Sequence, residues 1–282
     1  MEKIFKVAGI VYSVRNNAET DVPLTFENYS PFEIEVASDS DVLFTLHVDG
    51  LLCNTKEPDL YRSQDSYLID VPVWEDPTFG ILKVSSSLRE GRLLMKTCNR
   101  SCFDMAALIM FALAASNRGA LVMHSSVIVK DGKGYLFLGK SGVGKSTHTS
   151  LWVNSIPGAH LLNDDNPVLC VEDDIVKVYG SPWSGNTCCY LTEGYPVGAF
   201  VEVRRSLHNS MWSVGLPEAI SLVTKASVAR LAIPGIGERL LKTLLFIVKN
   251  YTVFILECLP ESRAAVMCHN ILLKTNTGKI ED

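Results

Sequence analysis

Hydrophobic and polar residues alternate with a period of two in short segments among the first hundred positions of this chain, which is typical of half-buried β-strands. The predicted strands cover residues 4–12, 32–36, 42–48, 67–73, 80–84 and 92–97. No chemical motif accompanies these strands. We therefore expect residues 1–100 to form a β-rich N-terminal region that could serve in substrate recognition or assembly.

From residue 101 the pattern becomes a mixture of helices and strands. Ser101 and Asp104 have the spacing of a capping box, and the apolar residues after them predict a buried helix that stops at Gly119. The later strands are predicted at residues 120–130, 135–138, 160–163, 167–171, 175–179, 199–203 and 251–257, and the later helices at 145–152, 217–231, 237–249 and from 260. Together they indicate an α/β domain over residues 101–282.

A glycine-rich segment lies between the predicted strand at 135–138 and the helix that follows it. It has the form G-x-x-x-x-G-K-[ST], the phosphate-binding loop or Walker A motif. Its glycines let main-chain N–H groups approach phosphate oxygens, and the helix adds the positive end of its dipole. Such a segment could be only a tight connection, but its context favours a nucleoside-triphosphate site. The predicted nucleotide-binding residues are Gly139, Lys140, Ser141, Gly142, Val143, Gly144, Lys145, Ser146 and Thr147.

Two functional side chains of the loop have separate expected roles. Lys145 should reach the outer phosphates, and the Ser146 hydroxyl should ligate magnesium. Two adjacent acids, Asp164 and Asp165, follow the strand predicted at 160–163 and could supply a second metal ligand and a base. They could also simply begin a turn, but ligands of α/β sheets collect at such strand ends.

Composition narrows the classes of partner. The net charge is −5 and the longest basic run is the pair Arg204-Arg205, so we expect no nucleic-acid partner. The longest apolar run, residues 105–115, is too short to cross a bilayer, and the N-terminus alternates, so we expect no membrane association. The eight cysteines include no C-x-x-C pair, which fits reduced thiols in a cytoplasmic protein.

Other classes of phosphate-loop protein leave signatures that this chain lacks. The sequence contains neither the guanine-recognition pattern N-K-x-D nor the L-S-G-G of transport ATPases. The nearby D-x-x-G, Asp131 to Gly134, precedes the loop and is therefore in the wrong order for a GTPase switch. It reads instead as the turn of a hairpin that leads into the loop.

Three segments in order carry a family resemblance: Met123-His124-Ser125-Ser126, the hairpin with its phosphate loop, and Leu161-Leu162-Asn163-Asp164-Asp165. Over about residues 119–205 they resemble the catalytic domain of HPr kinase/phosphorylase. They are most similar to HPr-kinase-like bacterial proteins, some of which accompany peptide-modification systems. The resemblance implies a mixed-sheet P-loop domain of the phosphoenolpyruvate-carboxykinase-like type.

The resemblance also implies roles at matching positions. Asp164 matches the general base for the acceptor hydroxyl and Asp165 the metal-side carboxylate, although the reverse assignment stays open. His124 matches a histidine close to the transferred phosphate. The predicted catalytic residues are thus Asp164, Lys145 and His124, the metal ligands Ser146 and Asp165, and the cofactors ATP and Mg²⁺.

The chain also departs from the family. Thr147 stands where the family has glutamate, and the family's glutamate-arginine-glycine segment has only loose candidates in Glu193 and Arg204. The N-terminal region does not resemble the family's regulatory domain, so HPr is not the expected substrate. His148 is expected to be a surface or packing residue, and residues 181–187 could line the acceptor pocket.

These observations predict an ATP- and magnesium-dependent kinase that phosphorylates a hydroxyl of a protein serine or a small molecule. Two alternatives stay open at this point. One is a nucleotide-binding regulatory or partner protein without turnover. The other is an ATPase, or a phosphorylase that runs the reverse reaction. Whether the protein forms a homo-oligomer is also left open.

Overall fold

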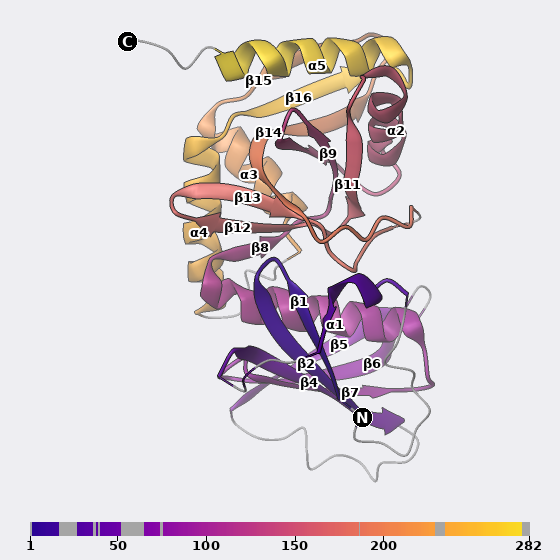
Figure 1. The fold of residues 1–282 in the computed structure, drawn as a ribbon, viewed down its shortest axis with the longest axis vertical. Helices are drawn as coiled ribbons and strands as arrows, with labels where there is room; N and C mark the ends of the chain where they lie inside the picture. The colour runs from indigo at the N-terminus through magenta and orange to yellow at the C-terminus, as the bar shows by residue number, and fades with distance from the viewer. Residues whose placement is uncertain are drawn as a thin grey trace. The chain divides into compact units, whose positions relative to one another are not determined.

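The computed structural model describes residues 2–16, 27–35, 38, 40–51, 65–73, 76–185, 187–228 and 235–277. The chain forms two compact units, Met1–Arg118 and Gly119–Asp282. Each unit combines a mixed sheet with helices, so the protein is a mixed α/β protein (Figure 1). The boundary lies later than the expected one at residue 100, because the helix after that residue packs against the N-terminal sheet.

The first unit is built on a seven-stranded sheet in the order β3-β1-β2-β4-β7-β6-β5. Its strands are β1 (Glu2–Val7), β2 (Ile10–Asn16), β3 (Glu33–Ile34), β4 (Val42–Leu51), β5 (Ser66–Val73), β6 (Asp76–Ser85) and β7 (Glu90–Met95). The prediction of one strand over residues 4–12 is wrong. Ala8 and Gly9 both have positive φ and turn the chain, so that β1 and β2 form a hairpin.

Helix α1 (Arg100–Ala115) supplies the apolar layer under this sheet. Its cap is Asn99, whose side chain accepts a hydrogen bond from the Cys102 N–H at 3.0 Å, rather than the predicted Ser101. On its sheet-facing side Phe111 meets an aromatic pair, Tyr12 and Phe44, whose rings stack at 4.9 Å. The helix is buried almost all round, which explains its continuous apolar sequence.

The second unit contains a nine-stranded mixed sheet in which seven strands follow the order β11-β9-β10-β14-β13-β12-β8, β16 pairs with β14, and β15 pairs with β16. The strands are β8 (Ala120–Val122), β9 (Ser125–Lys130), β10 (Lys133–Leu138), β11 (His160–Asp165), β12 (Val168–Glu172), β13 (Ile175–Tyr179), β14 (Gly194–Arg205), β15 (Ser210–Ser213) and β16 (Val253–Cys258). The helices are α2 (Lys145–Ser155), α3 (Leu216–Ala226), α4 (Ile236–Asn250) and α5 (Ser262–Thr277). Strand β14 is long enough to pair with β13 at its start and with β10 and β16 at its end.

Several predicted elements of this unit have other bounds. The strand expected over residues 120–130 divides into β8 and β9, because β8 pairs with β12 whereas β9 pairs with β10 and β11. The helix expected over residues 217–231 ends at Ala226, and Ser227 forms a β-bridge with Met123 instead. The end of that prediction, residues 229–231, lies outside the described residues.

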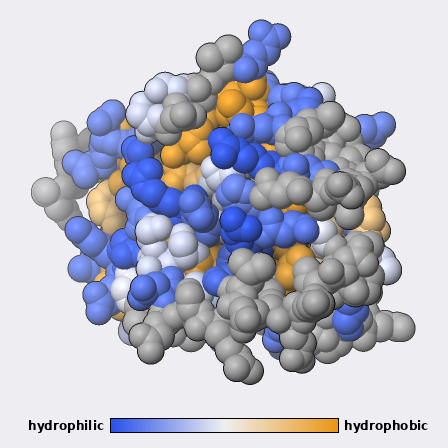
Figure 2. All heavy atoms as spheres, turned by 90° about the horizontal axis from the view of Figure 1, so that it is seen from below, coloured by the Kyte–Doolittle hydropathy of each residue, from blue (hydrophilic) through white to orange (hydrophobic). Residues whose placement is uncertain are grey.

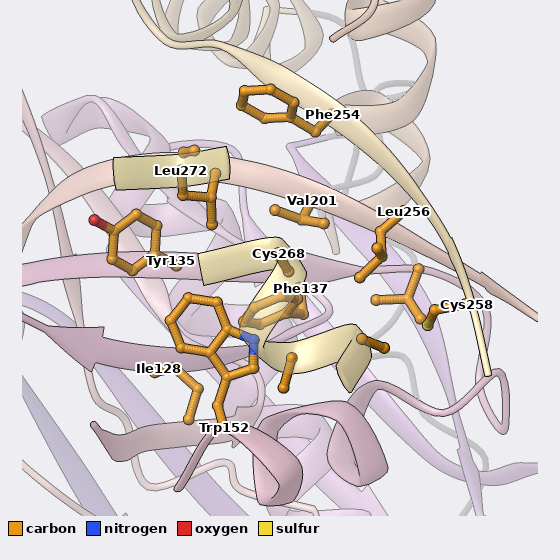
Figure 3. Close-up of a cluster of buried hydrophobic side chains, with 14 of the residues drawn as sticks. Ile128, Tyr135, Phe137, Trp152, Val201, Phe254, Leu256, Cys258, Cys268 and Leu272 are labelled. Atoms are coloured by element: carbon orange, nitrogen blue, oxygen red, sulfur yellow. The ribbon is translucent and has the colours of Figure 1, made fainter. Parts of the chain in front are cut away.

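A hydrophobic cluster fastens helices α2 and α5 to one face of the sheet (Figure 3). Trp152 of α2 is fully buried at its centre, and its ring centroid lies 5.6 Å from that of Phe137 of β10. Phe137 and Tyr135 alternate with residues that point to the opposite face, as a β-strand requires. This packing fixes the position of α2, and therefore of the phosphate loop that precedes it.

Replacing Trp152 with alanine should lower the free energy of unfolding by about 3–5 kcal/mol, because it empties the centre of this cluster. The measurement is denaturant unfolding followed by circular dichroism. Trp212→Ala is the matched control, since Trp212 is 41% exposed on β15, and it should cost much less. Equal losses for the two variants would contradict the central role given to Trp152.

The surface mixes residue types. In Figure 2, hydrophobic side chains reach the surface in areas interrupted by hydrophilic ones across the described part of the visible face. Among the described helices, none combines the length and the apolar character needed to span a bilayer.

Candidate active site

The candidate site lies at one edge of the second sheet, where the ends of several strands meet. Strand β9 lies between β10 and β11 and is antiparallel to both. Its first residues therefore lie at the same edge as the last residues of β10 and β11. Strand β14 runs parallel to β10, with Glu202 paired to Leu138, and so brings its own C-terminal part to this edge.

The break between β8 and β9 places His124 at this edge. The Met123 N–H donates to the Pro167 carbonyl at 3.0 Å, and the His124 N–H donates to the Ala226 carbonyl at 2.6 Å. These bonds hold the two residues between the strands, where a regular strand would have continued. The His124 imidazole contacts two predicted site residues: its Nε2 is 3.0 Å from Lys145 Nζ and its Nδ1 is 2.9 Å from Asp165 Oδ1.

The phosphate loop connects β10 to α2 as the sequence predicted. Gly139 has a φ of 136°, and a Cβ added there would lie 2.9 Å from Val143 Cγ1, so only glycine fits without a shift. Gly144, with a φ of 116°, precedes the first residue of α2. The N–H groups in the first turn of a helix have no intrahelical acceptor and are available for an anion.

Arg205, at the end of β14, donates hydrogen bonds to the phosphate loop. Its guanidinium donates to the main-chain carbonyls of Val143, at 3.1 Å, and of Gly142. The hydrogen bonds from Arg205 restrain the conformation of the loop, in addition to the backbone conformations that its glycines allow.

Lys145 is buried in the middle of the candidate site and is only 7% exposed. Its ammonium donates to the Gly139 carbonyl at 2.9 Å and contacts His124 as described above. Burial lowers the pKa of Lys145 from its usual value, and the charges of Asp165, Asp164 and Glu202 oppose that decrease. Lys145 therefore lies among three acidic side chains, those of Asp165, Asp164 and Glu202.

Asp164 is held by two hydroxyl groups. Ser126 Oγ donates to its Oδ1 at 2.6 Å, and Thr187 Oγ1 donates to its Oδ2 at 2.7 Å. The residue is only 6% exposed. The bond from Thr187 also brings the end of the segment 181–187 to the site; residue 186 of this segment lies outside the described residues.

Asp165 is more accessible, with a side chain that is 33% exposed. It accepts from His124, and the Asn166 side-chain amide donates to its second oxygen at 2.8 Å. Both acids lie within β11, paired with Ser125 and Ser126 of β9, rather than after a strand that ends at residue 163.

The donor atoms suit magnesium. Among the described residues, no group of three or more histidine, cysteine or acidic side chains is arranged to hold a metal ion. Magnesium needs fewer protein ligands, since it is usually held by one or two carboxylates together with substrate phosphates and water. The hydroxyl of Ser146 and the carboxylate of Asp165 are hard oxygen ligands of this kind.

Sequence reasoning gave no role to Glu202, Arg205 or Ser126, and it named Thr187 only as part of the possible acceptor-pocket segment 181–187. All four residues contact or face the predicted site residues. Burial raises the pKa of Glu202, while the charges of Arg204 and Lys145 lower it. The signal for Glu202 in the sequence was its charge near the end of the predicted strand 199–203, because that strand also ends at the ligand-binding edge.

The remaining sequence candidates have other contacts. Arg204 approaches Glu218 of α3, with an N–O distance of 3.8 Å. Glu193 contributes its backbone carbonyl to a hydrogen bond from Gly180. His148 is a buried packing residue: it accepts a hydrogen bond from Trp152 at 3.1 Å, and burial lowers its pKa to about 4, so its imidazole is neutral.

Comparison with solved structures finds similar chains, among them that of a kinase/phosphatase. The HPr(Ser) kinase/phosphatase from Coxiella burnetii is similar to this chain at 13% sequence identity and a TM-score of 0.34. The match covers 55% of this chain and 98% of the other. No protein-family model matches the sequence, and no curated protein does.

Proposed function

We propose that the second unit is an ATP- and magnesium-dependent phosphotransferase that phosphorylates a hydroxyl group. The observation that carries the proposal is the convergence of Lys145, His124, Asp164 and Asp165 beside a glycine loop that opens a helix. A loop alone would indicate only phosphate binding. A lysine and two carboxylates beside such a loop could supply the charge stabilisation, the metal ligand and the base that phosphoryl transfer uses.

In the proposed reaction, the loop N–H groups and Lys145 bind the polyphosphate and offset its charge. Magnesium, held by Ser146 and one of the acids, would neutralise charge on the outer phosphates. The acceptor hydroxyl gives its proton to the other acid while the hydroxyl oxygen forms a bond to the terminal phosphorus. The bond from that phosphorus to the bridging oxygen breaks, and ADP leaves with the electron pair.

The two acids divide the roles of base and metal ligand. Asp164 as base follows from the resemblance, and its bonds from Ser126 and Thr187 would fix its orientation toward an acceptor. The greater exposure of Asp165 favours the reverse assignment, because a base must meet the acceptor directly. The two assignments predict different effects of neutralising each acid.

His124 acts in this proposal by connecting Lys145 to Asp165. A lysine that donates to Nε2 requires the Nδ1 nitrogen to carry the ring hydrogen, which then donates to the carboxylate. The imidazole thereby keeps the lysine and the acid in a fixed relation beside the transferred phosphate.

Within this proposal the fold is the phosphoenolpyruvate-carboxykinase-like type of phosphate-loop domain. The support is topological: β10, which feeds the loop, has antiparallel β9 on one side and parallel β14 on the other. A purely parallel sheet would need a crossover helix where this chain has a hairpin. The same proposal includes a cytoplasmic location. It also includes an acceptor that is either a protein serine or a small molecule.

The test is incubation with ATP labelled in its γ-phosphate, magnesium and a lysate of the source cells. We expect label to appear in an acceptor that mass spectrometry can identify, and to require magnesium. Label released only as inorganic phosphate would indicate an ATPase. Nucleotide bound without any release or transfer would indicate the regulatory alternative, and both results would contradict the kinase.

A further inference from the structure

The segment between β13 and β14 brings an exposed hydroxyl group to one of the two acids. Thr187 is exposed, and its Oγ1 donates to Asp164 Oδ2 at 2.7 Å. The other carboxylate oxygen of Asp164 accepts from Ser126, which is fully buried in β9. Both oxygens of the acid therefore accept from hydroxyl groups of this chain, and of these two hydroxyl-bearing residues Thr187 is the exposed one.

We propose that Thr187 is a phosphorylation site of the protein, and that the chain transfers the terminal phosphoryl group of its bound nucleotide to this hydroxyl. The inference rests on the proposed function and names an acceptor for it within the same chain. Label on the chain itself and label on an outside acceptor can be measured separately, so the two proposals can be tested apart.

The contact between Thr187 and Asp164 has the distance that general-base catalysis requires. A base must lie about 2.6–3.2 Å from the oxygen whose proton it removes, and this contact falls within that range. Asp164 is only 6% exposed, so a hydroxyl from outside would have to displace Thr187 to reach the same carboxylate oxygen. Ser126 also contacts the acid, but it lies inside the sheet, where there is no room for a phosphate group. Of the two hydroxyl groups, that of Thr187 is the one suited to accept a phosphoryl group.

The acid that holds Thr187 lies on the side of the site where the terminal phosphate is expected. In a phosphate loop the lysine reaches the outer phosphates, which places them beside Lys145. His124 connects Lys145 to Asp165, the neighbour of Asp164 in β11, and the charges of both acids act on the lysine. The Thr187 hydroxyl is therefore at the same edge of the sheet as the phosphoryl group that would be transferred.

Hydrogen bonds on both sides of Thr187 fasten its segment to the sheet. Before it, Ser181 Oγ donates to the Asn166 carbonyl at 2.6 Å. After it, Cys189 Sγ donates to a carbonyl of β11 at 3.3 Å. Between them, Ser184 Oγ donates to the Thr187 carbonyl at 2.7 Å. An acceptor held in this way needs no separate binding step, which favours transfer within the chain.

In the proposed step, Thr187 Oγ1 forms a bond to the terminal phosphorus of ATP while the hydroxyl proton passes to Asp164. The bond between that phosphorus and the bridging oxygen breaks, and ADP leaves with the electron pair. The products are ADP and a phosphothreonine, so the step needs no reactant other than the nucleotide of the proposed function.

The test is incubation of the purified full-length protein with γ-labelled ATP and magnesium, without any other protein, followed by phosphopeptide mapping. Thr187→Val removes the hydroxyl and keeps nearly the same size, whereas Thr187→Ser keeps a hydroxyl at this position. Cys188→Ala is the matched control, because it changes an exposed neighbour and leaves the hydroxyl in place. Calorimetric titration with ATP shows for each variant whether the nucleotide site is intact.

We expect magnesium-dependent label on Thr187 of the wild-type chain, and label on residue 187 of Thr187→Ser. Thr187→Val should carry less label by about tenfold or more while it still binds ATP, because the hydroxyl on the base is gone. Cys188→Ala should be labelled like the wild type. Label that maps to another residue, or a Thr187→Val chain labelled as strongly as the wild type, would overturn the assignment.

A mixture of wild-type protein with a tagged Lys145→Ala chain tests whether transfer stays within one chain. We expect label on the wild-type chain alone, and label on the Lys145→Ala chain would overturn the intramolecular step. Label on an acceptor from the lysate with none on the protein itself would reject Thr187 as the acceptor and leave the proposed function standing. Label on neither would reject the proposed function, and the assignment of Thr187 with it.

Discussion

Replacement of Lys145 by alanine is expected to reduce phosphoryl transfer by on the order of 10²–10³-fold or more, while the fold is retained. The lysine is the cation among Asp164, Asp165 and Glu202, and it is the residue expected to contact the outer phosphates. Its loss leaves three carboxylates facing a triphosphate. The measurement is transfer of label from γ-labelled ATP, with circular dichroism to confirm folding.

Two further variants make this result specific. Lys145→Met removes the charge but keeps most of the side-chain volume, and it should match the alanine variant if charge is the cause. Lys249→Ala removes an exposed lysine near the end of α4 and should leave transfer unchanged. Transfer that survives in both Lys145 variants would reject the mechanism.

Neutralising Asp164 is expected to lower transfer far more than nucleotide binding if this residue is the base. Asp164→Asn keeps the shape of the side chain and an oxygen that can accept from Ser126 or Thr187, so the local fold should persist. Loss of a general base costs typically 10²–10⁴-fold in rate. Single-turnover transfer and magnesium-dependent ATP binding are measured on the same preparation.

Asp165→Asn is the matched comparison on the neighbouring residue. If Asp165 holds the metal, this variant should weaken ATP binding in magnesium but leave metal-free binding unchanged. The opposite pattern, with transfer lost in Asp165→Asn and magnesium-dependent binding lost in Asp164→Asn, would establish the reverse assignment. Equal losses of binding and transfer in Asp164→Asn would mark Asp164 as a metal ligand.

Local patterns predicted much of the second unit. The hairpin into the loop, the loop itself and the start of α2 at Lys145 lie where the sequence placed them. Each depends on neighbouring residues: a turn at Asp131-Gly132, glycines with positive φ, and a short apolar strand. Such signals act over a few residues and are therefore visible in the sequence.

The errors arose where distant partners overrode a local pattern. Residues 120–130 alternate like one strand, yet the chain breaks at His124 because β8 and β9 pair with different strands. The β11 strand extends through both acids because the start of β9 pairs with them. In the first unit, a helix predicted to belong with the phosphate loop packs under the N-terminal sheet instead.

The sequence by itself determined the glycine loop with Lys145 and the pair Asp164 and Asp165, since motif and order are local properties of the chain. It pointed to His124 only through a family resemblance. Only the tertiary structure decided that these side chains meet, that Glu202 and Arg205 join them, and that an exposed hydroxyl of a later loop reaches one of the acids. The physical reason is that strand order and direction bring these segments, far apart in the chain, to one edge of the sheet. No pattern within any one segment specifies which strand will be its neighbour.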